Sequence, residues 1–305
     1  MWFLGDVPVL LHSLAALFDQ PIYWQNLGLT RGIDLHYFTL RWYSLAYLVG
    51  IMLAYWHTAR AIKLPVPPMN QLNVDDLFFY CTLGVILGGR LGYATFYTGG
   101  QTGIPSLWAH PADLAKLWQG GMSFHGGLMG VILATGWVCW RGKLSFLRVI
   151  DFVAVGVPFG MFFGRLANFV NGELWGRVAG PDVPWAMIFP DAPDQLARHP
   201  SQLYEAGLEG LLLGAIMLTL FWKTRARLRP GLLAGVFGCG MALARFTVEF
   251  FREPDQQLTE FAMRSGLTMG QWLTLPIALA GLAFLLRALL TAPLVDPAAR
   301  RTLVH

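Results

Sequence analysis

Seven apolar segments, each close to the length that crosses a bilayer, constrain the fold of this 305-residue chain more than any other feature. A transmembrane helix needs about 20 mostly apolar residues. The composition agrees, with 55% hydrophobic and only 13% charged residues, because soluble domains contain about 25% charged residues. We predict an all-α polytopic membrane protein with seven transmembrane helices, at about 38–60, 77–97, 124–140, 149–168, 205–222, 231–251 and 270–290.

The distribution of lysine and arginine predicts how these spans are oriented. Twelve of the 22 basic residues follow the first, third, fifth and last spans, and seven lie in the other connections. Cytoplasmic connections of membrane proteins carry the excess of basic residues. The sequence therefore predicts an outside N-terminus, a cytoplasmic C-terminus, and outside positions for connections 98–123, 169–204 and 252–269.

We expect one membrane domain at 37–291, preceded by an interfacial segment at 1–36 and followed by a cytoplasmic tail at 292–305. The first segment contains a short amphipathic stretch near 8–18. The net charge of +4 is spread over the connections, so nucleic acid is not an expected partner. No spacing of His, Cys or carboxylates is typical of a metal site, and we expect no metal or cofactor.

The motif GRLANFVNGELWGR at 164–177 is the most polar stretch that directly follows an apolar span. Arg165, Asn168, Asn171 and Glu173 would be costly at membrane depth unless they face a cavity or a partner. They form either a polar seam between helices or a site. Glycines within the motif, Gly176 among them, allow a turn or a close approach of the backbone.

A second candidate is His125, which lies among glycines in GGMSFHGG at 120–127. A single histidine in a membrane protein is often a hydrogen-bonded packing residue, and that reading stays open. The neighbouring glycines let a substrate approach, and imidazole is suited to act as a general base near neutral pH.

In ARFTVEFFREPD at 244–255, the spacing of Arg245, Glu249 and Arg252 predicts three residues on one face of the sixth helix. Arg245 and Glu249 alone would form a self-neutralising pair. The second arginine leaves net positive charge, which favours an anionic ligand, and arginine is suited to bind phosphate.

Three further positions have open roles. RHPSQLYE at 198–205 is typical of a helix start, and we interpret Glu205 as part of that cap. Tyr43 is either an interfacial residue or part of a site. We expect Arg90 to pair with a carboxylate or with carbonyls inside the bundle.

The residues indicate a protein that binds a phosphate-bearing lipid. They contain no GxSxG motif, and no cysteine lies beside His125 or an arginine in sequence. An enzyme of this kind would bring two substrates together and take its nucleophile from one of them. Two alternatives remain, a transporter for anionic solutes and a non-catalytic lipid-binding scaffold. The absence of a visible repeat disfavours the transporter.

The motif at 164–177 resembles the signature of the prolipoprotein diacylglyceryl transferase family, and it matches every position of that pattern. GGMSFHGG, RHPSQLYE, VEFFREPD and MGQWLTLP resemble further family blocks in the same order, from about Leu35 to about Leu290. The resemblance implies a multi-pass enzyme of the bacterial inner membrane with a periplasmic active site. It would transfer diacylglyceryl from phosphatidylglycerol to the lipobox cysteine in the signal peptide of preprolipoproteins and release glycerol phosphate.

The resemblance also implies roles for individual residues. Arg165 and Arg245 would hold the phosphate, and His125 would be the base for the thiol. The expected substrate-binding residues are Tyr43, Asn168, Asn171, Glu173, Gly176, Glu249 and Arg252. The partners are phosphatidylglycerol, signal peptides and membrane lipids. Met241 stands where the family often has a tyrosine, so that hydroxyl contact is either absent or supplied by another residue such as Tyr43 or Tyr204.

Overall fold

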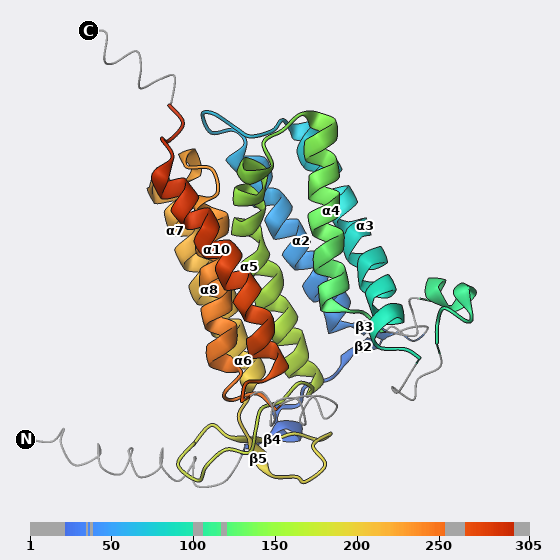
Figure 1. Ribbon diagram of the computed structural model, residues 1–305. Coiled ribbons are helices and arrows are strands. Elements are labelled where there is room, and N and C mark those ends of the chain that lie inside the picture. The colour runs from blue at the N-terminus through green and yellow to red at the C-terminus, as the bar shows by residue number, and fades with distance from the viewer. Residues whose placement is uncertain are drawn as a thin grey trace, which may run out of the picture.

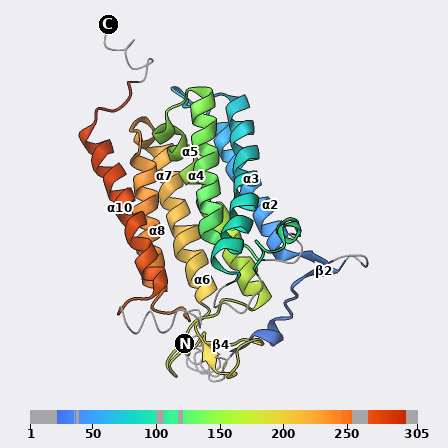
Figure 2. The same ribbon diagram turned by 45° about the vertical axis from the view of Figure 1, so that its right-hand side comes forward.

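The apolar segments form helices that run in alternating directions along one bundle (Figure 1, Figure 2). This computed structural model describes residues 22–34, 36, 39–99, 106–116, 121–253 and 266–295. The crossings are α2 (Trp42–Ala61), α3 (Gln71–Phe96), α4 (Phe124–Gly142), α5 (Phe146–Asn171), the continuous stretch α6 (Ser201–Glu205), η5 (Ala206–Leu212) and α7 (Leu213–Lys223), α8 (Leu232–Val248) and α10 (Met269–Leu290). The described part of the chain thus makes seven crossings, and its first and last residues lie at opposite ends (Figure 1).

The helices fit the predicted all-α polytopic membrane protein. Four of the described helices are long and apolar enough to cross a membrane, namely α3, α5, the α6–η5–α7 stretch and α10, and α8 is a shorter apolar helix. Large apolar side chains such as Leu133, Leu243 and Leu279 point outward and are more than 65% exposed. Such a surface is suited to lipid rather than to water.

Two helices begin earlier than their predicted spans, and in α3 a polar cap explains the earlier start. Asn70 caps α3 through a reciprocal pair of hydrogen bonds with Asn73, so the helix starts at Gln71 and not near residue 77. The fourth span, expected at 149–168, extends at both ends, because α5 runs from Phe146 through Asn171 and Gly172 ends it with φ 71°. Arg165 and Asn168 therefore lie within a regular helix.

Close contact between α3 and α4 depends on glycine. A Cβ on Gly130 would lie 2.0 Å from the carbonyl oxygen of Gly84, and one on Gly126 would lie 2.2 Å from that of Gly88. Small residues at helix interfaces allow backbones in a membrane to approach this closely. The pair places the N-terminus of α4, with His125, at the same end of the bundle as the end of α5 (Figure 1).

Short strands cover that end of the bundle (Figure 1). β1 (Ile22–Tyr23) pairs parallel with β4 (Met187–Ile188), which pairs antiparallel with β5 (Ala197–Arg198). β2 (Gly32–Asp34) and β3 (Thr39–Arg41) form a separate antiparallel pair. The 3-10 helix η1 (Trp24–Leu27) follows β1, and the Trp24 indole donates a 2.8 Å hydrogen bond to the Phe169 carbonyl at the end of α5. The stretch predicted near 8–18 lies outside the described residues.

At the opposite end, Asp151 of α5 holds the start of α8. Its carboxylate accepts hydrogen bonds from the backbone N–H groups of Gly231 at 2.7 Å and Ala234 at 2.8 Å. Both N–H groups lie at the N-terminus of α8, where backbone N–H groups have no acceptor within the helix. The adjacent core joins α5, α7 and α8 through buried side chains that include Val155, Met217 and Leu233. This arrangement fixes the helices that carry the polar groups at the other end.

Candidate functional site

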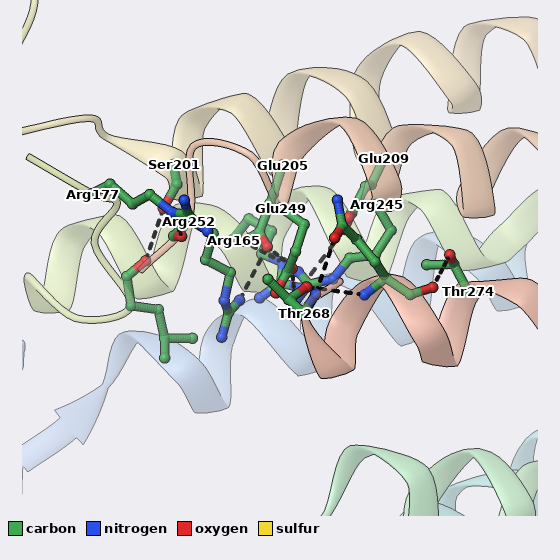
Figure 3. A network of polar contacts seen from close by, with 12 residues as sticks. Arg165, Arg177, Ser201, Glu205, Glu209, Arg245, Glu249, Arg252, Thr268 and Thr274 are labelled. Carbon is green, nitrogen blue, oxygen red and sulfur yellow. Dashed lines mark hydrogen bonds and ion pairs between the residues drawn. The ribbon is translucent and has the colours of Figure 1, made fainter. Parts of the chain in front are cut away.

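The predicted arginines meet around one buried carboxylate, Glu205 of α6 (Figure 3). Arg165 of α5 places its Nε 3.1 Å from Oε2 of Glu205. Arg245 of α8 and Arg252 both contact Oε1, the latter at 3.1 Å. The Glu205 side chain has no exposed surface. Glu205 therefore connects three arginines from separate parts of the sequence, and the interpretation of Glu205 as a capping residue is wrong.

Two more glutamates complete this group, which we call the arginine cluster: Arg165, Arg245, Arg252, Glu205, Glu209 and Glu249. Glu249 lies 3.1 Å from Arg245, and Glu209 of η5 lies 3.7 Å from Arg165. With all groups ionised, three positive and three negative charges balance. The net positive charge expected from Arg245, Glu249 and Arg252 alone is thus corrected, because the buried carboxylates of α6 and η5 offset it.

The backbone that places Arg252 in the cluster is not the helix that its spacing predicts. Arg245 and Glu249 pair at 3.1 Å with the predicted helical spacing. Helix α8 ends at Val248, however, so Arg252 lies beyond it and is not on the same helical face. The chain turns after the helix, and Arg252 forms an antiparallel bridge with Gly176. This isolated bridge, which no helical spacing predicts, positions Arg252.

Gly176 is tightly enclosed at this bridge. A Cβ there would lie 2.4 Å from the Phe251 carbonyl oxygen and 2.6 Å from that of His199. The Gly176 carbonyl accepts a 3.1 Å hydrogen bond from Arg198, whose guanidinium stacks over Trp175 at 4.5 Å. Only glycine allows the two segments to approach this closely.

Charged and aromatic groups outside the bundle hold this loop region together. Arg198 also pairs with Asp194 at 2.6 Å, and this hydrogen bond lowers the pKa of the Asp194 carboxyl. His199 lies 3.1 Å from the Tyr204 hydroxyl, and burial lowers the pKa of the imidazole. The Tyr204 hydroxyl also accepts a 2.6 Å hydrogen bond from Trp185.

A second polar group adjoins the arginine cluster, formed by Tyr43, Asn168, Asn171 and Glu173. The Tyr43 hydroxyl donates to the Glu173 carboxylate and accepts from the Asn168 amide. Asn171 donates to the same carboxylate at 3.0 Å. Gln202 of α6, three residues before Glu205, donates to the Glu173 carbonyl at 2.7 Å. The structure therefore brings all four predicted residues together, and α6 links them to the cluster.

His125 occupies the first turn of α4 at the same end of the bundle, and its side chain is exposed. Arg165 and Arg245 form ion pairs with Glu205 of α6, Glu209 of η5 and Glu249, the residue that follows α8. The role of His125 as a base stays a prediction.

The prediction that Arg90 pairs with carbonyls is confirmed, although these carbonyls belong to the connection before α4 and not to the bundle helices. Its buried guanidinium donates to the backbone carbonyls of Leu114 at 3.1 Å, Asp113 at 2.8 Å, Gly121 at 3.1 Å and Lys116 at 3.2 Å. It fixes the connection before α4.

The arginine cluster is suited to bind an anion. The arginine side chains remain 13–21% exposed, whereas those of Glu205 and Glu209 have no exposure. An approaching anion would meet guanidinium N–H groups before carboxylate oxygens. Arginine donates in pairs to phosphate oxygens, so the geometry fits a phosphate group. Glu209 was not predicted as a site residue, although an ionisable residue inside a membrane span itself indicates a functional site.

Comparison with known proteins agrees with this chemistry. The sequence model of the family described as prolipoprotein diacylglyceryl transferase matches residues 32–287. Proteins named phosphatidylglycerol–prolipoprotein diacylglyceryl transferase are similar to the chain over most of its length. That of Erythrobacter litoralis is 62% identical over 89% of this chain and 93% of its own length. Those of Zymomonas mobilis and Rhodospirillum rubrum are 51% and 49% identical, over 85% and 88% of this chain and 85% and 95% of their own lengths.

Proposed function

Because this chain belongs to the prolipoprotein diacylglyceryl transferase family, we propose that it transfers diacylglyceryl from phosphatidylglycerol to a prolipoprotein. The acceptor is the thiol of the lipobox cysteine in the signal peptide. The products are a thioether and glycerol phosphate. The observation that supports this proposal best is the convergence of Arg165, Arg245 and Arg252 on Glu205.

In the proposed reaction, the sulfur attacks the lipid glycerol carbon that carries the phosphate ester. The carbon–oxygen bond breaks, and its electron pair moves to the phosphate oxygen of the departing glycerol phosphate. Arg165 and Arg245 bind the phosphate and stabilise this charge. Guanidinium groups already fixed by Glu205 need little rearrangement when the charge develops, which is how a preorganised site lowers a barrier.

The thiol must lose its proton, because the thiolate is the nucleophile and a free cysteine has a pKa of about 8.5. We assign this step to the imidazole of His125, which lies at the same end of the bundle as the arginines. Tyr43, Asn168, Asn171 and Glu173 would bind the glycerol headgroup through their amide, hydroxyl and carboxylate groups. Gly176, Glu249 and Arg252 would hold the surrounding backbone and guanidinium groups in place.

The proposed location is the bacterial inner membrane, with the N-terminus and the site toward the periplasm and the C-terminal tail in the cytoplasm. The excess of basic residues at the end opposite the site supports this orientation. A membrane-impermeant thiol reagent tests it in intact spheroplasts, in a background whose three native cysteines are replaced. Gly180→Cys should be labelled and Lys143→Cys should not, and the reverse result would refute the orientation.

The activity is tested with purified protein in detergent micelles that contain phosphatidylglycerol, and a synthetic lipobox peptide. The peptide should gain the mass of diacylglyceryl while glycerol phosphate is released. Arg165→Ala in the protein, or Cys→Ser in the peptide, should abolish both signals. Arg60→Ala, an exposed arginine at the opposite end of the bundle, is the matched control and should retain activity. Folded protein that produces no mass gain would refute the proposal.

A further inference from the structure

The charge balance of the arginine cluster raises a question about phosphate binding. Its three arginines and three glutamates are formally neutral as a group. A bound phosphodiester adds one negative charge beside glutamates whose side chains are buried. An uncompensated charge is costly when buried. Loss of one negative charge from the cluster would offset the phosphate, and the contacts single out one carboxylate for this role.

Glu209 is the carboxylate with the weakest contacts. Glu205 contacts three arginines, and Glu249 contacts Arg245 at 3.1 Å. Glu209 has a single ion pair, at 3.7 Å to Arg165, and neither of its oxygens has a hydrogen-bond partner in the described part of the chain. Its side chain has no exposed surface. An ionised carboxylate in such surroundings depends on the nearby arginines alone for stabilisation.

The local backbone agrees with a special role for this position. Glu209 lies in η5, a π-helical stretch inserted between α6 and α7. Such bulges in helices are frequently found at functional sites. The charged groups that face Glu209 are Arg165 from α5, Glu205 from α6, and Arg245 and Arg252 from α8 and the turn beyond it. The negative charge of a phosphate bound to these arginines would therefore act directly on Glu209.

We propose that Glu209 takes up a proton from solvent when the lipid phosphate binds the arginines, so that the cluster stays neutral. The proposal rests on the proposed function, because it assumes that the lipid phosphate binds at Arg165 and Arg245. In the empty site, Glu209 offsets part of the arginine charge. In the lipid-bound site the phosphate replaces it as the counter-ion, and Glu209 is a neutral acid. Glu209 is thus a positioning residue that does not contact the reacting atoms.

Proton uptake makes lipid affinity depend on pH. Where one proton binds with each lipid, the dissociation constant rises about tenfold for each pH unit. Above neutrality the phosphodiester itself does not titrate, so this slope reports on the protein. Lipid affinity is therefore expected to fall as the pH rises.

The experiment titrates short-chain phosphatidylglycerol into the purified full-length protein without peptide, by calorimetry at pH 8. Two buffers with different heats of ionisation give the number of protons taken up. We expect about one proton per bound lipid in the wild type and none in Glu209→Gln, which should still bind. Glu253→Gln, an exposed glutamate just beyond Arg252 that lies outside the cluster, is the matched control and should retain the uptake.

Binding without proton uptake in the wild type, or unchanged uptake in Glu209→Gln, would overturn the proposal. If Glu209→Gln does not fold, the pH dependence of wild-type affinity decides: a tenfold loss per pH unit supports the proposal, and a flat profile refutes it. Infrared difference spectra with glycerophosphoglycerol, which lacks ester carbonyls, should show a new protonated carboxyl band. A wild type that transfers lipid without proton uptake refutes only this inference, whereas one that neither binds nor transfers lipid refutes the proposed function too.

Discussion

Substituting Gly176 with alanine tests whether the bridge to Arg252 positions the arginine cluster. The added Cβ would lie 2.4 Å from one backbone carbonyl oxygen and 2.6 Å from another. Real Cβ atoms essentially never approach closer than 3.0 Å, and backbone atoms cannot rotate away as a side chain can. The two segments must therefore separate, and Arg252 moves away from Glu205, which it contacts at 3.1 Å.

The expected size follows from the nature of the clash. Overpacking of a tight contact costs about 1–3 kcal/mol, and a weakened hydrogen bond from Arg198 to the Gly176 carbonyl adds about 1 kcal/mol. We expect the free energy of unfolding to fall by about 3 kcal/mol. Displacing a guanidinium that holds the cluster should lower kcat at least tenfold, since a factor of ten corresponds to about 1.4 kcal/mol.

Two measurements check this prediction. Tryptophan fluorescence during unfolding in mixed micelles gives the stability, and the peptide transfer assay gives kcat for the folded protein. Gly180→Ala is the matched control, because a Cβ at Gly180 meets nothing within 4 Å, and it should behave as the wild type. A Gly176→Ala protein with wild-type kcat would refute the idea that this bridge positions the arginines.

Three other substitutions examine separate parts of the structure. Arg165→Lys should lower kcat/KM about 30-fold or more, because one ammonium cannot replace a guanidinium that contacts both Glu205 and Glu209. An unchanged kcat/KM would show that the reaction does not require a planar guanidinium at this position. His125→Gln should lower kcat about 100-fold if the imidazole accepts the thiol proton, and a change in KM alone would assign it to binding. Asp151→Ala should lower the unfolding free energy by about 2 kcal/mol, because two helix N–H groups lose their acceptor; its kcat should stay unchanged, and a large fall would connect that end of the bundle with the chemistry.

The sequence predicted the helices well because apolar length is a local property. The positions of α4 and α10 follow from hydrophobic runs bounded by polar residues. The end of α8 did not follow, because no residue near Val248 breaks a helix, and the chain turns there to pair Arg252 with Gly176. A partner far away in the sequence decided that boundary.

The sequence predicted the arginines of the candidate site but not all of its glutamates. Arg165 and Arg245 stand out because an arginine in an apolar segment needs an explanation. Glu205 follows a proline and a serine, where a local capping role is the simpler interpretation. Its actual contacts come from α5 and α8, and only the packing of three helices reveals them. The π-helical turn that places Glu209 beside Arg165 likewise has no sequence pattern that we recognised.

The cluster around Glu205 also sets an order for biosynthesis. Arg165 leaves the ribosome before any of its carboxylate partners, because Glu205 and Glu209 follow only after the loop at 172–200 has been made. Arg252, the last member, is added after α8. A nascent chain that ends at residue 200 therefore presents α5 to the lipid with an arginine that still lacks its counter-ions. Arg165 gains its counter-ions once residue 209 has been made, and the charges of the whole cluster balance only when the chain through residue 252 has been inserted.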